Sequence, residues 1–147
     1  TLGVAFYRGA DAVILVYDIS DPISFKNISQ WKQDFIDNGS PNKPNEFPFI
    51  LFGNKCDLPS NKKKVHSTEV ENWIKQNGAN IPFYETSAKS ATNIEQGFNT
   101  VASLAIKYNQ SIDGDSGYKF KEVTFDDDFK KGGKARKKKD KCDCTLL

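Results

Sequence analysis

The sequence predicts an α/β fold in which a parallel sheet is flanked by helices. Three short apolar runs alternate with three segments whose apolar residues recur at helical spacing, which gives the element order βαβαβα. The first two runs are unbroken, as is typical of strands that are buried on both faces of a parallel sheet. A chain of 147 residues is long enough to form one domain with a hydrophobic core.

The first strand is predicted over residues 12–17, which read Ala-Val-Ile-Leu-Val-Tyr. A helix follows, because Asp21 is a favourable N-cap and Pro22 suits the first helical turn. Residues 39–41, Gly-Ser-Pro, end this helix. Its core-facing residues share helical spacing and are Phe25, Ile28, Trp31 or Lys32, and Phe35.

The second strand is predicted over residues 49–52, which read Phe-Ile-Leu-Phe. The next helix is predicted over residues 67–76, with Thr68 and Glu71 as a capping box and Gly78 as its stop. The residues of this helix that face inward are Val70, Trp73 and Ile74.

The third strand is predicted over residues 81–86, and the last helix follows it. One face of that helix carries five apolar residues, which are Ile94, Phe98, Val101, Ala102 and Ala105. Helical periodicity ends at Ser111, and residues 111–129 are rich in Gly, Ser and Asp. This composition predicts a flexible linker.

A polar motif follows each of the last two strands. Residues 54–57 read Asn-Lys-Cys-Asp, and residues 85–89 read Glu-Thr-Ser-Ala-Lys. Because ligands of parallel sheets bind at the carboxyl ends of the strands, we expect both motifs to lie at one edge, together with Asp18. The Asp57 carboxylate offers two acceptors, which match the adjacent N1–H and N2–H donors of guanine. Adenine has an unprotonated N1 there, so Asp57 is the predicted guanine-specificity residue.

Together with residues 6–11, Phe-Tyr-Arg-Gly-Ala-Asp, these motifs resemble the Rab family of the Ras-like small GTPases. The resemblance covers about residues 1–109 and implies the C-terminal part of a Ras-like P-loop GTPase domain. Residues 40–49 and 93–98 look most similar to the late-endosomal and lysosomal Rab branch.

The resemblance implies a nucleotide-binding set of six residues, which are Asn54, Lys55, Asp57, Ser87, Ala88 and Lys89. In that family pattern Asp57 pairs with guanine N1 and N2, and Ser87 orients its carboxylate. The backbone N–H of Ala88 donates to guanine O6.

The other three residues of the set hold the base in place by the same resemblance. Asn54 holds the base edge and ties the two loops together, while the stems of Lys55 and Lys89 sandwich the ring. The family further implies GTP and GDP as ligands, with Mg²⁺ expected for the full-length protein.

The sequence lacks the motifs that would bind the phosphates. It contains no Gly-x-x-x-x-Gly-Lys-Ser/Thr, no switch-one threonine and no Asp-x-x-Gly-Gln. We therefore expect no catalytic residue and no metal ligand in this chain, which alone should neither hydrolyse GTP nor bind it tightly.

Since Met is also absent, we expect an N-terminally incomplete sequence. Residues 1–109 form a partial GTPase domain in this interpretation, and residues 110–147 form a hypervariable linker, a polybasic stretch and a prenylation tail.

Residues 130–147 form a strongly basic tail with eight Lys or Arg and two Asp, although the net charge of the whole chain is +2. The last four residues fit a prenylation box whose final leucine favours geranylgeranylation, which makes Cys144 a predicted lipidation site. Cys142 lies two residues earlier, so lipidation of Cys144 alone and of both cysteines remain open. A lipid together with a polybasic stretch gives stable attachment to an anionic membrane.

The leading functional interpretation is a Rab-type GTP/GDP-binding switch that regulates vesicle trafficking on the cytoplasmic face of endomembranes. The resemblance favours the late endosome and lysosome, with a cytosolic pool. It implies an exchange factor, a GTPase-activating protein, effectors, a prenylation escort and a dissociation inhibitor as partners.

The alternative is a truncated, non-hydrolysing adaptor tethered to a membrane. We expect no nucleic acid partner, because no aromatic residues are interleaved with the basic run of the tail.

Overall fold

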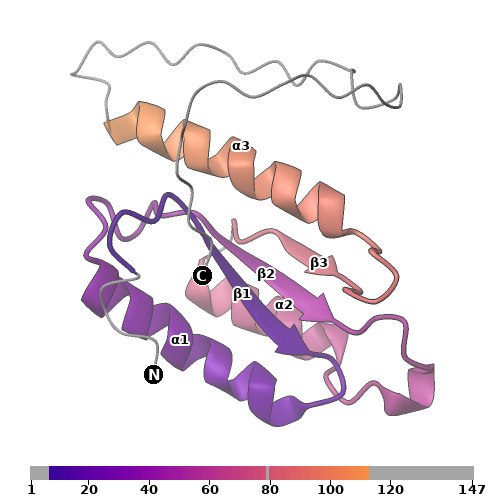
Figure 1. Cartoon of the computed structure of the whole chain (residues 1–147). Helices are drawn as coiled ribbons and strands as arrows, with labels where there is room; N and C mark the ends of the chain where they lie inside the picture. Colours follow the sequence, from indigo (N-terminus) through magenta and orange to yellow (C-terminus); the bar gives the residue numbers. More distant parts are fainter. Residues whose placement is uncertain (1–6, 79, 113–147) are drawn as a thin grey trace, which may run out of the picture. The chain divides into compact units, whose positions relative to one another are not determined.

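The computed structural model describes residues 7–78 and 80–112, and every structural statement below concerns these residues. These residues form three strands that alternate with three α-helices, as the sequence predicts (Figure 1). The elements in chain order are β1 (Val13–Asp18), α1 (Pro22–Gly39), β2 (Phe49–Asn54), the 3-10 turn η2 (Ser60–Lys62), α2 (Ser67–Asn77), β3 (Phe83–Glu85) and α3 (Ile94–Ile112). Helix α3 continues to Ile112, and the rest of the predicted linker and the tail lie outside the described residues.

The three strands form one parallel sheet in the order β1-β2-β3. The register pairs Asp18 with Asn54, and Gly53 with Glu85. The carboxyl ends of all three strands therefore lie at one edge of the sheet. This edge holds Asp18 and the start of both polar motifs.

Helices cover the two faces of the sheet unequally. In Figure 1, α1 and α2 lie on one side of the sheet and α3 lies on the other. The first side contains the main hydrophobic core, in which Ile28 of α1 and Leu51 of β2 are completely buried. Trp73 of α2 also joins this core and donates its indole N–H to Ser29 Oγ at 2.8 Å, which links α2 to α1.

Aromatic rings close the core at the amino ends of the strands. The Phe35 ring lies 4.7 Å from the Phe47 ring and 5.7 Å from the Phe49 ring, measured between centroids. Phe47 also meets Tyr108 of α3 at 5.2 Å, edge to face. Edge-to-face pairs of this kind stabilise a fold by about 0.5–1.5 kcal/mol each beyond the area that they bury.

Helix α1 begins and ends as predicted. The Asp21 carboxylate accepts a hydrogen bond from the Ile23 N–H at 2.9 Å, and Pro22 occupies the first turn. Ser40 follows the helix in the left-handed region, with φ 47°, which ends the helical backbone.

The predicted capping box of α2 is wrong. The N-cap is His66 rather than Thr68, and the Glu69 carboxylate accepts the His66 N–H at 2.9 Å. The helix begins at Ser67, so Thr68 already lies inside the first turn and Glu69, rather than Glu71, occupies the third helical position.

The predicted apolar face of α3 is partly wrong, because Phe98 is 54% exposed while Gly97 is buried. A Cβ atom at position 97 would overlap the Phe52 ring, so the helix approaches β2 through its glycine. This close approach rotates Phe98 to the flank of the contact, where its ring still meets the edge of Phe52 at 6.1 Å. Val16 of β1, an edge strand of the described sheet, and Trp31 of α1 are also half-exposed, and both line a pocket along β1.

Candidate functional site

The first polar loop leaves β2 beside Gly53, which packs closely against β1. A Cβ atom on Gly53 would lie 2.8 Å from the Tyr17 hydroxyl, so a larger residue at this position would require the ring of Tyr17 to shift. The chain then turns at Lys55, which has a left-handed backbone with φ 70°. This turn directs residues 54–57 across the carboxyl edge of the sheet.

Backbone hydrogen bonds hold the two polar loops together beyond the end of the sheet. The Thr86 N–H donates to the Gly53 carbonyl at 2.9 Å, and the Cys56 N–H donates to the Thr86 carbonyl at 2.9 Å. Thr86 and Ser87 are almost completely buried under this contact. The second loop is therefore a fixed platform beside the first.

Asp57 is held by a buried hydroxyl of the second loop. The Ser87 Oγ donates to Asp57 Oδ1 at 2.5 Å and accepts a hydrogen bond from the Ser90 N–H at 3.1 Å. The bond from Ser87 lowers the pKa of Asp57 below its ordinary value, and the nearby charges of Lys89 and Lys55 act in the same direction. Asp57 is exposed to solvent and ionised at neutral pH, so its carboxylate can accept hydrogen bonds from a ligand.

Asn54 joins the two loops through its side chain. Its Oδ1 accepts the Ala88 backbone N–H at 3.0 Å. This N–H is the donor that the family pattern assigns to guanine O6, so the role of Ala88 toward a base stays a prediction. Lys89 follows on the same loop with an exposed side chain.

Lys55 makes an ion pair with the end of β1. Its Nζ lies 2.6 Å from Asp18 Oδ2, and this contact raises the pKa of Lys55. The N–H and the hydroxyl of Ser20 both donate to Asp18 Oδ1, at 2.8 and 2.6 Å. The strand pattern predicts Asp18 at this edge but does not indicate its partners. A serine two residues after an aspartate is the signal of such a local turn.

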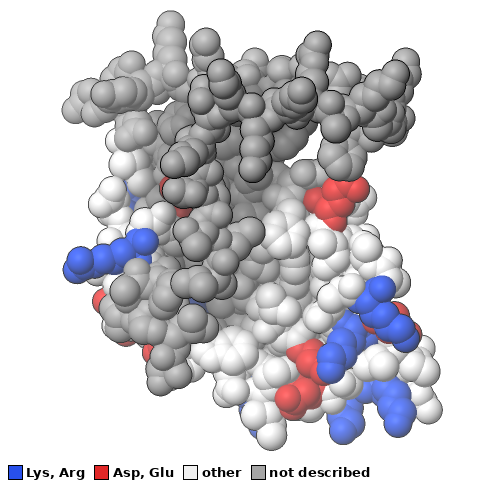
Figure 2. Space-filling model, viewed as in Figure 1, with Lys and Arg blue, Asp and Glu red and all other residues white. Residues whose placement is uncertain are grey.

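Acidic and basic side chains alternate around this edge. Figure 2 shows them interspersed over the part of the surface where η2 lies, without a large patch of one sign. One such contact joins Lys63 to Glu85 at 2.8 Å. The surface here suits a ligand that is read by hydrogen bonds rather than by a strong field of one sign.

The two polar loops present an ionised carboxylate in a fixed setting at the carboxyl edge of the sheet. Asp57 supplies acceptors, and the loops around it are fixed by side-chain and backbone hydrogen bonds. Within residues 7–78 and 80–112, no group of three or more His, Cys, Asp or Glu side chains could hold a metal ion. In the same residues no helix is long and apolar enough to cross a membrane.

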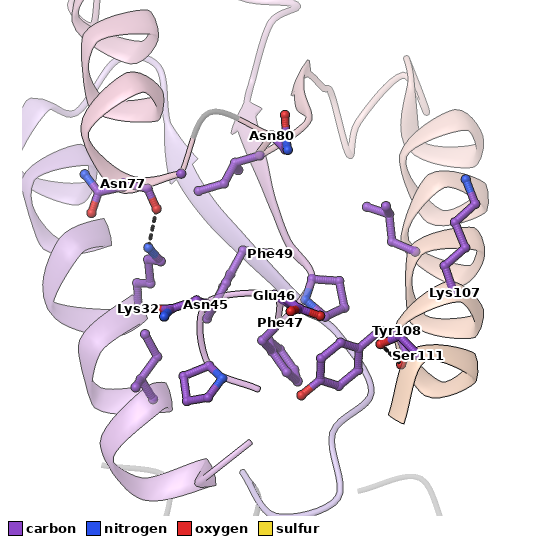
Figure 3. Close-up of a pocket in the computed structure, with 16 residues that line it drawn as sticks. Lys32, Asn45, Glu46, Phe47, Phe49, Asn77, Asn80, Lys107, Tyr108 and Ser111 are labelled. Carbon is purple, nitrogen blue, oxygen red and sulfur yellow. Dashed lines mark hydrogen bonds between the residues drawn. The ribbon is translucent and has the colours of Figure 1, made fainter. Parts of the chain in front are cut away.

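A separate pocket of about 480 Å³ lies at the opposite edge of the sheet. Figure 3 shows Phe47 and Phe49 in this pocket, with Lys32 and Tyr108 at its sides. Lys32 Nζ donates to the Asn77 carbonyl at 2.5 Å, and burial lowers its pKa. Because ligands of parallel sheets bind at the carboxyl ends of the strands, this pocket at their amino ends is not the candidate site.

Comparison with known proteins identifies the family. The model of the Ras family matches residues 1–107. The chain is 48% identical to the Ras-related protein Rab-7a of Paramecium octaurelia over 105 residues, which are 71% of this chain and 50% of that protein. It is 44% identical to Rab-7a of Dictyostelium discoideum over 112 residues, 76% of this chain and 54% of that protein.

The Ypt/Rab-type GTPase ypt7 of Schizosaccharomyces pombe is 44% identical over 113 residues, which are 77% of this chain and 55% of that protein. The chain thus spans about half the length of the curated relatives that it matches. The parallel sheet, the two polar loops at its carboxyl edge and these similarities agree with one another. The chain therefore belongs to the Ras family, and the relatives that it resembles within that family are Rab-7a and Ypt/Rab-type proteins.

Proposed function

We propose that this protein is a guanine-nucleotide-binding switch that regulates vesicle trafficking on late endosomes and lysosomes. The observation that carries the proposal is the pair of hydrogen bonds that fix the two loops, from the Ser87 hydroxyl to Asp57 and from the Ala88 backbone N–H to Asn54. The names of the relatives, Rab-7a and a Ypt/Rab-type GTPase, support the same function.

Asp57 distinguishes guanine from adenine in this proposal. One oxygen already accepts the Ser87 hydroxyl, and the carboxylate keeps lone pairs for the N1–H and N2–H donors of guanine. Adenine would bring an unprotonated N1 to a carboxylate, and each would be left without a hydrogen bond. A site built in this way rejects the wrong base far more strongly than an apolar pocket does.

The remaining residues of the site hold the ring and the loops. Asn54 keeps the two loops at a fixed separation, and Lys55 and Lys89 contribute their stems to the two faces of the base. GTP and GDP would be the ligands, and Mg²⁺, when bound with the phosphates, would neutralise their charge. No described residue is assigned to the metal.

The switch would act on a membrane through partners and a lipid. Hydrolysis of GTP changes the conformation of switch loops in such proteins, which exchange factors, GTPase-activating proteins and effectors recognise. A prenyl group on Cys144, with or without a second on Cys142, would attach the protein to the membrane. A prenylation escort and a dissociation inhibitor would bind the prenylated protein. The adaptor alternative has no observation of its own in its favour.

The test uses the protein translated from the complete reading frame that contains this chain. Asp57→Asn replaces an acceptor by an amide donor, so we expect the ratio of GDP to ADP affinity to fall by about 100-fold or more. Competition of both nucleotides against fluorescent GDP measures this ratio. Asp37→Asn on the exposed face of α1 is the matched control, and we expect it to leave the ratio unchanged. An unchanged ratio in Asp57→Asn would refute the proposed function.

A further inference from the structure

Asp18 carries a fixed carboxylate at the candidate site. It is the last residue of β1, and the register places it beside Asn54 at the end of β2. Its Oδ1 accepts two hydrogen bonds from Ser20, and its backbone N–H donates to Ser24 Oγ at 3.0 Å. Only 21% of the Asp18 side chain is exposed, so the orientation of the carboxylate is set by its own strand end.

Lys55 meets this carboxylate from the neighbouring loop. Its ammonium nitrogen lies 2.6 Å from Asp18 Oδ2, although 55% of the Lys55 side chain is exposed. Among the described residues, Asp18 is the one carboxylate within ion-pair distance of Lys55. The left-handed backbone at position 55 fixes one end of this side chain, and Asp18 fixes the other.

An ordered lysine is unusual at an exposed position, because its long stem has many rotamers in solution. A ligand that packs on such a stem must first order it, and this cost weakens binding. A fixed acceptor removes that cost before the ligand arrives. The Asp18–Lys55 contact therefore has a use at a binding site that it would not have on an ordinary surface.

We propose that Asp18 is a positioning residue for nucleotide binding, which holds the Lys55 side chain so that its stem is ordered for contact with the face of the base. This inference rests on the proposed function, since it assigns Lys55 to the base. It separates two roles within the site. Asp57 reads the edge of the base and sets which base is bound, whereas Asp18 acts through Lys55 on the face and sets how long any purine nucleotide stays bound.

The first experiment measures the dissociation rate of fluorescent GDP from the protein translated from the complete reading frame. In Asp18→Asn we expect dissociation to be about fivefold faster, a modest effect because the ion pair is partly exposed. We expect the ratio of GDP to inosine diphosphate affinity to stay as in wild type, because the edge contacts of Asp57 are untouched. Glu46→Gln breaks the Lys43–Glu46 ion pair at the other edge of the sheet and is the matched control.

A double-mutant cycle separates positioning from a general structural effect. If Asp18 acts through Lys55, Asp18→Asn has no further effect on dissociation in a Lys55→Ala background. Lys55→Met, which removes the ammonium at an exposed position and keeps a stem, should accelerate dissociation as much as Asp18→Asn and provides a test should Asp18→Asn unfold.

Two outcomes would overturn the inference. One is an unchanged dissociation rate in Lys55→Met, and the other is an effect of Asp18→Asn that persists in the Lys55→Ala background. A wild-type protein that binds ADP as tightly as GDP would instead refute the proposed function, so the two failures are distinguishable.

Discussion

At the scale of residues, the site depends on a few hydrogen bonds to side chains, which join segments far apart in the sequence. Ser87 and Asp57 are 30 residues apart, and Ala88 and Asn54 are 34 residues apart. The motifs themselves could be read from the sequence, because strand ends and acceptor chemistry predict where Asp57 lies and what it binds. The contact of Lys55 with Asp18 could not be predicted from the sequence, since it depends on the register of two neighbouring strands and on a left-handed turn.

The ionisation of two carboxylates at the site predicts a pH dependence of stability. For Asp18, partial burial raises the pKa, but the hydrogen bonds from Lys55 and Ser20 outweigh this effect and lower it. The pKa of Asp57 is also lowered, mainly by Ser87. Because both folded pKa values lie below the unfolded value of about 3.9, their stabilisation is complete above about pH 5. It is lost as the pH falls through the folded values.

Ser87→Ala removes the main cause of the low Asp57 pKa. We expect this pKa to rise toward its ordinary value and the free energy of unfolding to fall less as the pH is lowered below about 5. Carbon-13 NMR titration of the carboxyl and urea unfolding at several pH values measure the two effects. The control is Ser103→Ala, because the hydroxyl of Ser103 donates to a carbonyl within α3. An Asp57 pKa that stays low in Ser87→Ala would contradict the assigned cause.

At the scale of elements, local signals predicted the strands and helices better than the faces that they bury. Asp21 and residues 39–41 mark the ends of α1 in the sequence, and the structure confirms them. The start of α2 at residue 67 was predicted, but its capping residues were not, because His66 is a weak N-cap signal while Thr68 is a strong one. The exposure of Phe98 depends on the close contact of Gly97 with Phe52, which is a tertiary feature that periodicity does not contain.

Gly97→Ala tests the contact between α3 and the sheet. In an exposed helix this change stabilises by about 1 kcal/mol, but here the new methyl overlaps the Phe52 ring, so we expect a loss of about 1–3 kcal/mol. Urea unfolding of the protein measures the change. Phe52→Leu in the same chain removes part of the ring and should recover part of the loss. A Gly97→Ala protein more stable than wild type would show that α3 does not approach β2 so closely.

At the scale of the whole molecule, the parallel order β1-β2-β3 brings both motifs to one edge of the sheet. This arrangement could be predicted, because alternating strands and helices of this length favour a parallel sheet. The pocket beside Phe47 and Phe49 could not be predicted, since it is formed by residues 44–49 together with residues of all three helices rather than by a motif. The basic tail remains a sequence prediction that lies outside the described residues.

The basic composition of the tail predicts that the affinity of the prenylated protein for anionic membranes falls as the salt concentration rises. Each Lys or Arg near an anionic surface contributes about 1 kcal/mol, so replacing Lys137, Lys138 and Lys139 by Ala should weaken binding of the prenylated protein to anionic vesicles by about 100-fold at low salt. Vesicle sedimentation at two salt concentrations measures the loss, which should shrink at high salt. Replacing Lys62, Lys63 and Lys64 of the folded domain is the matched control. Equal losses in the two triple variants would contradict a role specific to the tail.

The central claim is that a guanine base binds at the carboxyl edge of the sheet. Amide chemical-shift mapping of the protein from the complete reading frame tests it directly, with GDP and ADP added at equal concentrations. We predict that GDP shifts the amides of residues 54–57 and 86–89 and that ADP does not. Equal shifts with both nucleotides, or GDP shifts confined to residues 44–49 and 77–81 at the opposite edge, would contradict the claim.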